Sequence, residues 1–184
     1  KMIIGSPENA IKLLSDGGVI GYPTEAVFGL GCDPWNEKAV VRISNIKNRN
    51  SKKPFLLVAS SINQLTNLVD INIITEKVRS TWPGHTTWLI PAKKDVPYWL
   101  IDEDTGLIGI RISDHPVINK ICDKFQSPII STSANISGDK NIKDQKVFIS
   151  EFQNKVDYLI EGDIGNYSKP SIIIDMRTNE NIRK

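Results

Sequence analysis

Residues 117–138, which read VINKICDKFQSPIISTSANISG, decide the class of the fold. Apolar residues at helical spacing predict a helix over Val117–Phe125. The apolar run that follows Pro128 predicts a buried strand over Ile129–Ser131, and a hydroxyl-rich turn then extends to Gly138. A helix followed directly by a buried strand is typical of a sheet whose faces are covered by helices.

The same alternation continues on both sides of this stretch. Ser6 and Pro7 predict the start of a short helix, and Asn36 is expected to cap a second helix that carries Val40 and Ile43. Helical patterns also occur near Thr75–Trp82 and Val147–Phe152, and strands are expected over Val19–Tyr22, Phe55–Ala59, Thr86–Ile90, Leu107–Ile112, Tyr158–Ile160 and Ile172–Asp175. The weaker alternation after Val147 favours a mixed α/β sheet over a fully parallel one.

The composition is that of one ordinary globular domain. The 184 residues suffice for a single well-covered core, so we expect one domain over residues 1–184. Lys and Arg number 23 against 21 Asp and Glu, and this net charge of +2 does not imply a large nucleic-acid footprint. No segment approaches the run of about 20 apolar residues that spans a membrane, so we expect no membrane association and a cytoplasmic location.

The chain has too few metal-ligating side chains for a structural zinc site. Cys32 and Cys122 are the only cysteines, and only His85 and His115 could assist them. We therefore expect no metal site, and we expect both cysteines to be packing residues. His115 is expected to be a local cap or a surface residue. The sequence also lacks a dinucleotide-binding fingerprint, a phosphate-binding P-loop and a nucleophile-elbow motif.

A basic interval without acidic residues lies between Glu37 and Asp70. It contains Lys38, Arg42, Lys47, Arg49, Lys52 and Lys53, and so lacks counter-charges of its own. In an extended loop, Lys47 and Arg49 would project on the same side, where a guanidinium fork and a mobile ammonium could hold a small polyanion. The alternative is a solvated basic helix end and loop.

Two further segments offer polar groups beside the expected strands. Ser131–Gly138 could present side-chain and backbone donors to an anion, although Ser and Asn also favour ordinary capped turns. Arg111 interrupts an apolar strand, and a buried cation there requires an anionic partner, either a protein carboxylate or a substrate carboxylate. Trp82, beside a Pro-Gly turn, is expected to anchor the core.

Six short blocks follow one another along the chain. They are Tyr22–Glu25, Phe28–Asp33, Lys47–Arg49 with Lys53 and Pro54, Trp82–Gly84, Ile110–Ile112 and Ser131–Gly138. In this order they resemble the YrdC/TsaC family of threonylcarbamoyl-AMP synthases. The hallmark of this family is a Lys-x-Arg pair and a Ser-x-Asn pair, which are matched here by Lys47 with Arg49 and by Ser133 with Asn135. The resemblance covers nearly the full chain.

The resemblance implies a YrdC-like twisted mixed sheet, flanked by helices, with a large concave cavity. It also implies a reaction that joins L-threonine, bicarbonate and ATP to give threonylcarbamoyl-AMP and pyrophosphate, the first step toward N6-threonylcarbamoyladenosine next to the anticodon of tRNA. Mg²⁺ would be carried with the nucleotide.

Residue by residue, the resemblance also assigns the site. The nucleotide would contact Lys47, Arg49, Lys53, Ser133, Asn135, Asn141 and Arg183, with Lys47 and Arg49 as the catalytic pair near the phosphates. Threonine would contact Thr24, Arg111, Ser131 and Ser171.

Two features depart from many relatives. Ala26 stands where a second threonine is usual, and no histidine occurs near Val58, so the chain resembles the short bacterial single-domain form. Because the sequence ends at Lys184, we do not expect the additional C-terminal domain of the longer members. The expected partner is the downstream tRNA threonylcarbamoyl transferase complex of TsaB, TsaD and TsaE.

Two other functions are compatible with the sequence. A non-catalytic module could track double-stranded RNA with its basic interval, although the small net charge and the lack of an RNA-binding motif speak against it. Weak RNA binding would also be compatible with the enzyme. A carbamoyl-transfer domain related to hydrogenase maturation shares the implied fold, but such proteins carry extra domains.

Overall fold

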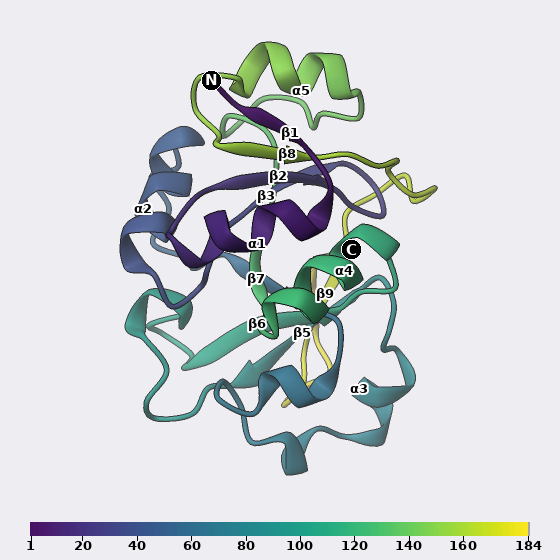
Figure 1. Ribbon diagram of the computed structural model, residues 1–184. Coiled ribbons are helices and arrows are strands. Elements are labelled where there is room, and N and C mark those ends of the chain that lie inside the picture. The colour runs from purple at the N-terminus through teal and green to yellow at the C-terminus, as the bar shows by residue number, and fades with distance from the viewer. Residues whose placement is uncertain (184) are drawn as a thin grey trace.

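One sheet of ten strands runs through residues 1–183, the part of the chain that the computed structural model describes (Figure 1). The strands are β1 (Ile3–Gly5), β2 (Ile20–Pro23), β3 (Phe28–Gly31), β4 (Leu56–Ala59), β5 (Thr86–Pro91), β6 (Leu107–Ile112), β7 (Ile129–Ser133), β8 (Tyr158–Ile160), β9 (Ile172–Asp175) and β10 (Asn181–Arg183). Their order in the sheet is β1-β8-β2-β3-β7-β4-β6-β5-β9-β10. Strand β4 pairs parallel with β6 but antiparallel with β7, so the predicted mixed α/β sheet is confirmed. Lys184, the last residue of the predicted domain, lies outside the described residues.

Helices flank this sheet at the places that the sequence pattern predicts (Figure 1). They are α1 (Pro7–Ser15), α2 (Glu37–Ile46), α3 (Glu76–Ser80), α4 (Pro116–Phe125) and α5 (Gln145–Phe152), with short 3-10 helices at Ile62–Leu65, Ile71–Ile73 and Tyr98–Leu100. The Asn36 side chain accepts a hydrogen bond from Ala39 N at 3.1 Å and so caps α2 as expected. Within residues 1–183, no helix is both long enough and apolar enough to cross a bilayer.

Helices α1 and α4 lie side by side over one face of the sheet (Figure 1). Leu14 of α1 and Ile121 of α4 are fully buried there, together with Ile20 of β2 and Ile129 of β7. Full burial of such a side chain contributes about 1.5–3 kcal/mol relative to exposure. This apolar layer therefore fixes the strand ends that β2 and β7 contribute to the site.

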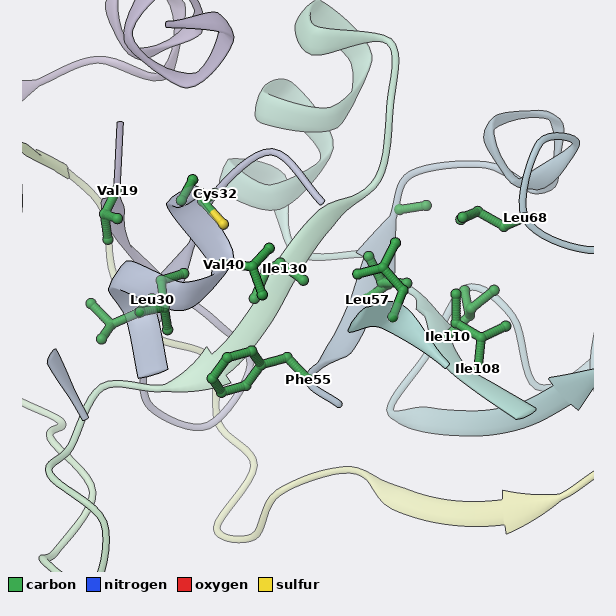
Figure 2. Packing of buried hydrophobic residues seen from close by; sticks show 14 of the residues in the cluster. Val19, Leu30, Cys32, Val40, Phe55, Leu57, Leu68, Ile108, Ile110 and Ile130 are labelled. Carbon is green, nitrogen blue, oxygen red and sulfur yellow. The ribbon is translucent and has the colours of Figure 1, made fainter. Parts of the chain in front are cut away.

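A larger apolar cluster covers the centre of the sheet (Figure 2). It joins Val40 of α2 to Leu30 of β3, Ile130 of β7, Leu57 of β4 and Ile110 of β6. These strands come from distant parts of the sequence, and the cluster holds them in one register.

Three strands escape the sequence pattern. Strands β1 and β10 are only three residues long, and β3 contains Gly29 and Gly31, which carry no side chain for an alternation to show. The strand predicted over Ile129–Ser131 is confirmed, since Ser131 pairs with Leu56, but its predicted end is wrong because β7 continues to Ser133. The hydroxyl groups of this segment therefore begin on a strand rather than in a loop.

The structural roles expected for isolated residues are mostly confirmed. Trp82 is buried in the core, and its indole Nε1 donates to the backbone oxygen of Thr86 at 3.0 Å. Cys32 and Cys122 are fully buried, and burial raises the pKa of both thiols. His115 caps α4, since its Nδ1 accepts from Val117 N at 3.2 Å, but it is buried rather than on the surface.

Candidate functional site

A cavity of about 470 Å³ lies against strands β4, β5, β6, β7, β9 and β10. Most of the residues predicted to bind substrates line it, namely Thr24, Arg49, Lys53, Arg111, Ser131, Ser133, Asn141, Ser171 and Arg183. They come from segments spread over the whole chain, and the sheet order brings them together. Lys47 and Asn135 are not part of this lining.

The floor of the cavity is apolar. On β6, Leu107, Gly109 and Arg111 share the cavity face because side chains alternate along a strand. A Cβ atom on Gly109 would lie 2.4 Å from the Leu56 side chain and 3.3 Å from that of Leu89. Glycine at this position therefore lets the Leu56 and Leu89 side chains pack close against β6.

Arg111 forms the most buried ion pair of the site. Its Nη1 donates to Glu25 Oε1 at 2.6 Å, and both residues are less than a tenth exposed. Burial opposes ionisation of Glu25, but the charge of Arg111 and the hydrogen bond from Ser113 outweigh it, so the pKa of Glu25 is lowered. The prediction of an anionic partner for Arg111 is confirmed, and the partner is a protein carboxylate. Arg111 nevertheless also lines the cavity, where a second anion can reach it.

The turn after β2 contributes the neighbours of Glu25 to the lining. Thr24, Ala26 and Val27 line the cavity. Val58, near which this sequence has no histidine, packs in the core. Thr24 Oγ1 donates to Val27 O at 2.6 Å and accepts from Val27 N at 3.3 Å. These bonds hold the Thr24 side chain against the backbone of Val27.

A second polar cluster joins residues that were expected to contact different substrates. Ser171 Oγ lies 2.8 Å from Thr87 Oγ1. Arg183 donates to the backbone oxygen of Ser171 from Nε at 2.9 Å and from Nη2 at 2.7 Å. Burial, and then the charge of Arg111, lower the pKa of Arg183, so the two guanidinium groups are near each other in one cavity.

Arg49 and Lys53 supply positive charge from the segment after α2. The Arg49 guanidinium lies 4.6 Å from the centroid of the Phe55 ring, and its Nη2 donates to Lys53 O at 3.2 Å. Burial lowers the pKa of Arg49, although an arginine remains protonated at neutral pH. The guanidinium is thus held over the Phe55 ring, and Nη2 is its only nitrogen with a hydrogen-bond acceptor among residues 1–183.

The prediction that Lys47 and Arg49 project together from an extended loop is wrong. Lys47 caps the C-terminus of α2 in the right-handed helical conformation, and Asn48 follows in the left-handed region with a φ of 49°. The chain therefore turns sharply between the two cations. Arg49 reaches the cavity lining, whereas Lys47 is buried behind it.

The buried ammonium of Lys47 bonds to the Ser-x-Asn segment. It donates to the backbone oxygen of Ser133, to Asn135 O at 3.0 Å and to Asn135 Oδ1 at 3.1 Å. Asn135 Oδ1 also accepts from Ser133 Oγ at 2.6 Å. Burial, and then the nearby charge of Arg49, lower the pKa of Lys47 to about 8. The hydrogen bonds of Lys47 therefore link the Lys-x-Arg pair to the Ser-x-Asn pair.

The basic interval is only partly a site feature. Arg42 pairs with Asp157, a counter-charge that comes from outside the interval. Of its six cations, Arg49 and Lys53 line the cavity and Lys38 is exposed on α2. The alternative of a solvated basic helix end and loop holds for Lys38 and Lys52, which are exposed and do not line the cavity.

The sequence interpretation missed several residues of the site. Thr87, His85, Asp102 and Asp175 line the cavity, and the sequence offers no signal for them because their place depends on strand pairing. Glu25 could have been found, since it closes a recognised block and Arg111 required a carboxylate. Within residues 1–183, no group of three or more His, Cys, Asp or Glu side chains could hold a metal ion.

Comparisons of sequence give one family and one function. A profile of the Sua5/YciO/YrdC family, described as telomere recombination, matches residues 12–184. The chain is 43% identical over 181 residues to a threonylcarbamoyl-AMP synthase of Coxiella burnetii, and the match covers 97% of this chain and 96% of that protein. It is 42% identical over 178 residues to a threonylcarbamoyl-AMP synthase of Wigglesworthia glossinidia brevipalpis, with 95% and 91% covered.

Comparisons of structure agree with the fold. Escherichia coli YciO matches with a TM-score of 0.83 and 25% identity, covering 100% of this chain and 96% of that one. P. abyssi Sua5, in a complex with L-threonine, matches with a TM-score of 0.87 and 26% identity and covers 98% of this chain. This chain spans only 56% of the Sua5 chain.

Proposed function

The chain belongs to the Sua5/YciO/YrdC family, and we propose that its threonylcarbamoyl-AMP synthase reaction takes place in the cavity lined by Arg49, Arg111 and Ser133. The reaction joins L-threonine, bicarbonate and ATP and releases pyrophosphate. One observation carries the assignment of the site: residues from distant segments, chosen from the sequence, share one recess of about 470 Å³.

Threonine is proposed to bind at the Arg111 end of the cavity. Arg111 offers guanidinium donors to the substrate carboxylate, and Thr24, Ser131 and Ser171 offer hydroxyl groups to its polar atoms. The Sua5 relative binds L-threonine, which agrees with this proposal.

The nucleotide is proposed to occupy the rest of the cavity. Arg49, Lys53 and Arg183 supply positive charge for the phosphates, and Ser133 and Asn141 supply polar contacts. The Leu56 and Leu89 side chains beside Gly109 offer an apolar surface for the adenine base. Mg²⁺ is proposed to arrive with ATP and to be held mainly by phosphate oxygens and water.

The chemistry requires control of charge. The threonine amine attacks the carbon of bicarbonate and gives an N-carboxylate and water. An oxygen of this carboxylate then attacks the α-phosphorus, and the bond to pyrophosphate breaks. Both reaction partners are anions, so cations fixed before the reaction lower the barrier by reducing repulsion and by stabilising charge on the phosphates.

Lys47 and Asn135 are proposed to act differently from the sequence-based assignment. The ammonium of Lys47 already has an acceptor for each of its three protons, and neither residue lines the cavity. Their proposed role is to hold Ser133 in place, whereas Arg49 is proposed to remain the cation that contacts the phosphates.

Further steps of the pathway are part of the same proposal. The product would be consumed by the tRNA threonylcarbamoyl transferase complex of TsaB, TsaD and TsaE, which would place this protein in the cytoplasm. Weak RNA binding would assist that transfer but would not be needed for synthesis. We also propose that residues 1–184 act as one YrdC-like domain, since the sheet uses strands from both ends of the described chain.

Pyrophosphate release tests the proposed function. It should require ATP, bicarbonate and L-threonine, and it should stop when any one of the three is omitted. Release that persists without threonine would argue against the assigned reaction. A double-stranded RNA-binding module would instead bind RNA without threonine, with an affinity that falls steeply as salt rises.

A further inference from the structure

One buried carboxylate lies directly behind the proposed threonine end of the cavity. Glu25 is 4% exposed and does not line the cavity, although its neighbours Thr24 and Ala26 do. Its Oε1 accepts from Arg111 Nη1 at 2.6 Å and from the hydroxyl group of Ser113. Glu25 can therefore affect a ligand in the cavity only through the residues that it contacts.

We propose that Glu25 is a positioning residue for threonine: it fixes one edge of the Arg111 guanidinium so that the remaining N–H groups face the substrate carboxylate. This inference rests on the proposed function. It adds a residue that touches no substrate and acts only through Arg111.

The geometry of Arg111 leaves donors free for a ligand. A guanidinium carries five N–H groups. Among the described residues 1–183, the side chain of Arg111 donates only to Glu25. Arg111 has no buried polar atom without a partner, so its other donors are reached from the cavity that it lines.

Glu25 is itself held from two segments, residues 111–115 and 165–167. Ser113 Oγ donates to the carboxylate and accepts from His115 N at 2.9 Å. On the backbone, Tyr167 N donates to Glu25 O at 3.1 Å, and Gly165 N donates to Thr24 O at 2.8 Å. A carboxylate fixed in this way holds the guanidinium in one orientation, which an arginine with several rotatable bonds would not keep alone.

The negative charge of Glu25 has a second effect on Arg111. Burial, and then the charge of Arg111, lower the pKa of Arg183, so the two guanidinium groups repel each other. A carboxylate behind Arg111 offsets this repulsion inside a partly dry cavity. Without it, Arg111 would be pushed away from Arg183 and out of the orientation that suits a carboxylate ligand.

The test uses Glu25→Gln, which keeps the shape of the side chain and removes its charge. We expect the KM for L-threonine, and its Kd by calorimetry, to rise about tenfold or more, because a displaced contact group weakens binding by that order. The KM for ATP should stay unchanged. A residue with a purely structural role would impair both substrates alike.

A double-mutant cycle with Arg111→Gln separates action through Arg111 from direct action. In the Arg111→Gln background, adding Glu25→Gln should cause no further loss of threonine affinity. Asp157→Asn, which removes the carboxylate of the Arg42 pair outside the cavity lining, is the matched control and should leave threonine affinity unchanged.

Ser113→Ala provides a second route if Glu25→Gln does not fold. It removes one support of the carboxylate and should weaken threonine binding by a smaller factor, again with an unchanged KM for ATP. Wild-type threonine affinity in both folded variants, or full additivity in the cycle, would overturn the inference while leaving the proposed function intact. A wild-type protein that binds no threonine would overturn both.

Discussion

The Nζ atom of Lys47 lies 3.1 Å from Oδ1 of Asn135 and 3.0 Å from the backbone oxygen of the same residue. The Lys-x-Arg and Ser-x-Asn pairs are thus linked to each other inside the protein. Only Arg49 and Ser133 of the four residues line the cavity. Arg49 and Ser133 face the proposed substrates, whereas Lys47 and Asn135 hold the segment that carries Ser133 in place.

Lys47→Ala is expected to lower turnover by about 10², the effect of losing one preorganised contact, because the segment that carries Ser133 would be free to move. The protein should also be less stable, since each buried acceptor left without a donor costs about 1–3 kcal/mol. Pyrophosphate release and urea denaturation measure the two effects. Lys38→Ala, at an exposed position of α2, is the control and should change neither. Normal turnover in folded Lys47→Ala would show that Ser133 does not depend on this lysine.

The titration of Lys47 predicts opposite slopes for stability and turnover. Its pKa is lowered from 10.5 to about 8, so between these values the unfolded chain holds a proton that the folded chain has released. The contribution of this group to the free energy of unfolding therefore rises with pH in that window. Turnover should fall there, because a neutral amine has only two N–H donors for three acceptors.

This pH dependence is measured as a difference between wild type and Lys47→Met, so that other titrating groups cancel. Unfolding and pyrophosphate release would each be followed between about pH 7 and pH 11, on either side of the lowered pKa. The Met variant should lack both changes. A wild-type turnover that stays flat relative to the variant would exclude the proposed role of the ammonium.

Much of this fold follows from local sequence pattern. Helices α1 to α5 were predicted, because positions such as Val40 and Ile43 repeat at helical spacing and Asn36 offers a cap, whereas the short 3-10 helices were not. Strand β3 was not predicted, because Gly29 and Gly31 give no alternation, and its place depends on pairing with β2 and β7. Strand order is a long-range property, and no window of sequence contains it.

The sequence predicted which residues belong to the site, but it did not predict how their side chains are oriented. The blocks around Arg49, Arg111 and Ser133 were recognised in sequence, and the structure brings them into one lining. Sequence could not show that Lys47 turns away from Arg49, since this depends on the left-handed conformation of Asn48. Burial of Arg111 likewise required an anionic partner, and Glu25 at the end of a recognised block was a candidate, but only the fold shows that the two side chains meet.

Arg49→Ala is expected to lower turnover by about 10² or more, since the phosphates would lose a fixed cation of the cavity. Arg49→Lys should recover only part of this activity, because an ammonium cannot reproduce the planar fork or the contact over the Phe55 ring. Pyrophosphate release at saturating threonine measures the effect. Lys52→Ala, an exposed neighbour, serves as the control. Full activity of Arg49→Ala would argue that the phosphates lie elsewhere.

Arg111→Ala should weaken threonine binding and leave ATP binding largely intact. It should also destabilise the protein by about 3–5 kcal/mol, because Glu25 would remain as a buried charge without its cation. The pKa of Glu25 would then rise, so mild acid should restore part of the stability by neutralising the carboxyl group. Calorimetry with each substrate and denaturation at several pH values test these expectations. Equal threonine affinity in the variant would reject the assigned role.

Gly109→Val tests where the adenine base lies. The new side chain would extend into the cavity beside Leu56 and Leu89, and its first carbon would already be 2.4 Å from the flexible end of Leu56. Valine suits a strand, so β6 should persist, with a strain of about 1–3 kcal/mol from overpacking. We expect ATP affinity to fall about tenfold, which corresponds to 1.4 kcal/mol, while threonine affinity at the Arg111 end stays near that of the wild type. If ATP binds the variant normally, the base does not rest on this floor, and the polar end of the cavity must hold the whole nucleotide.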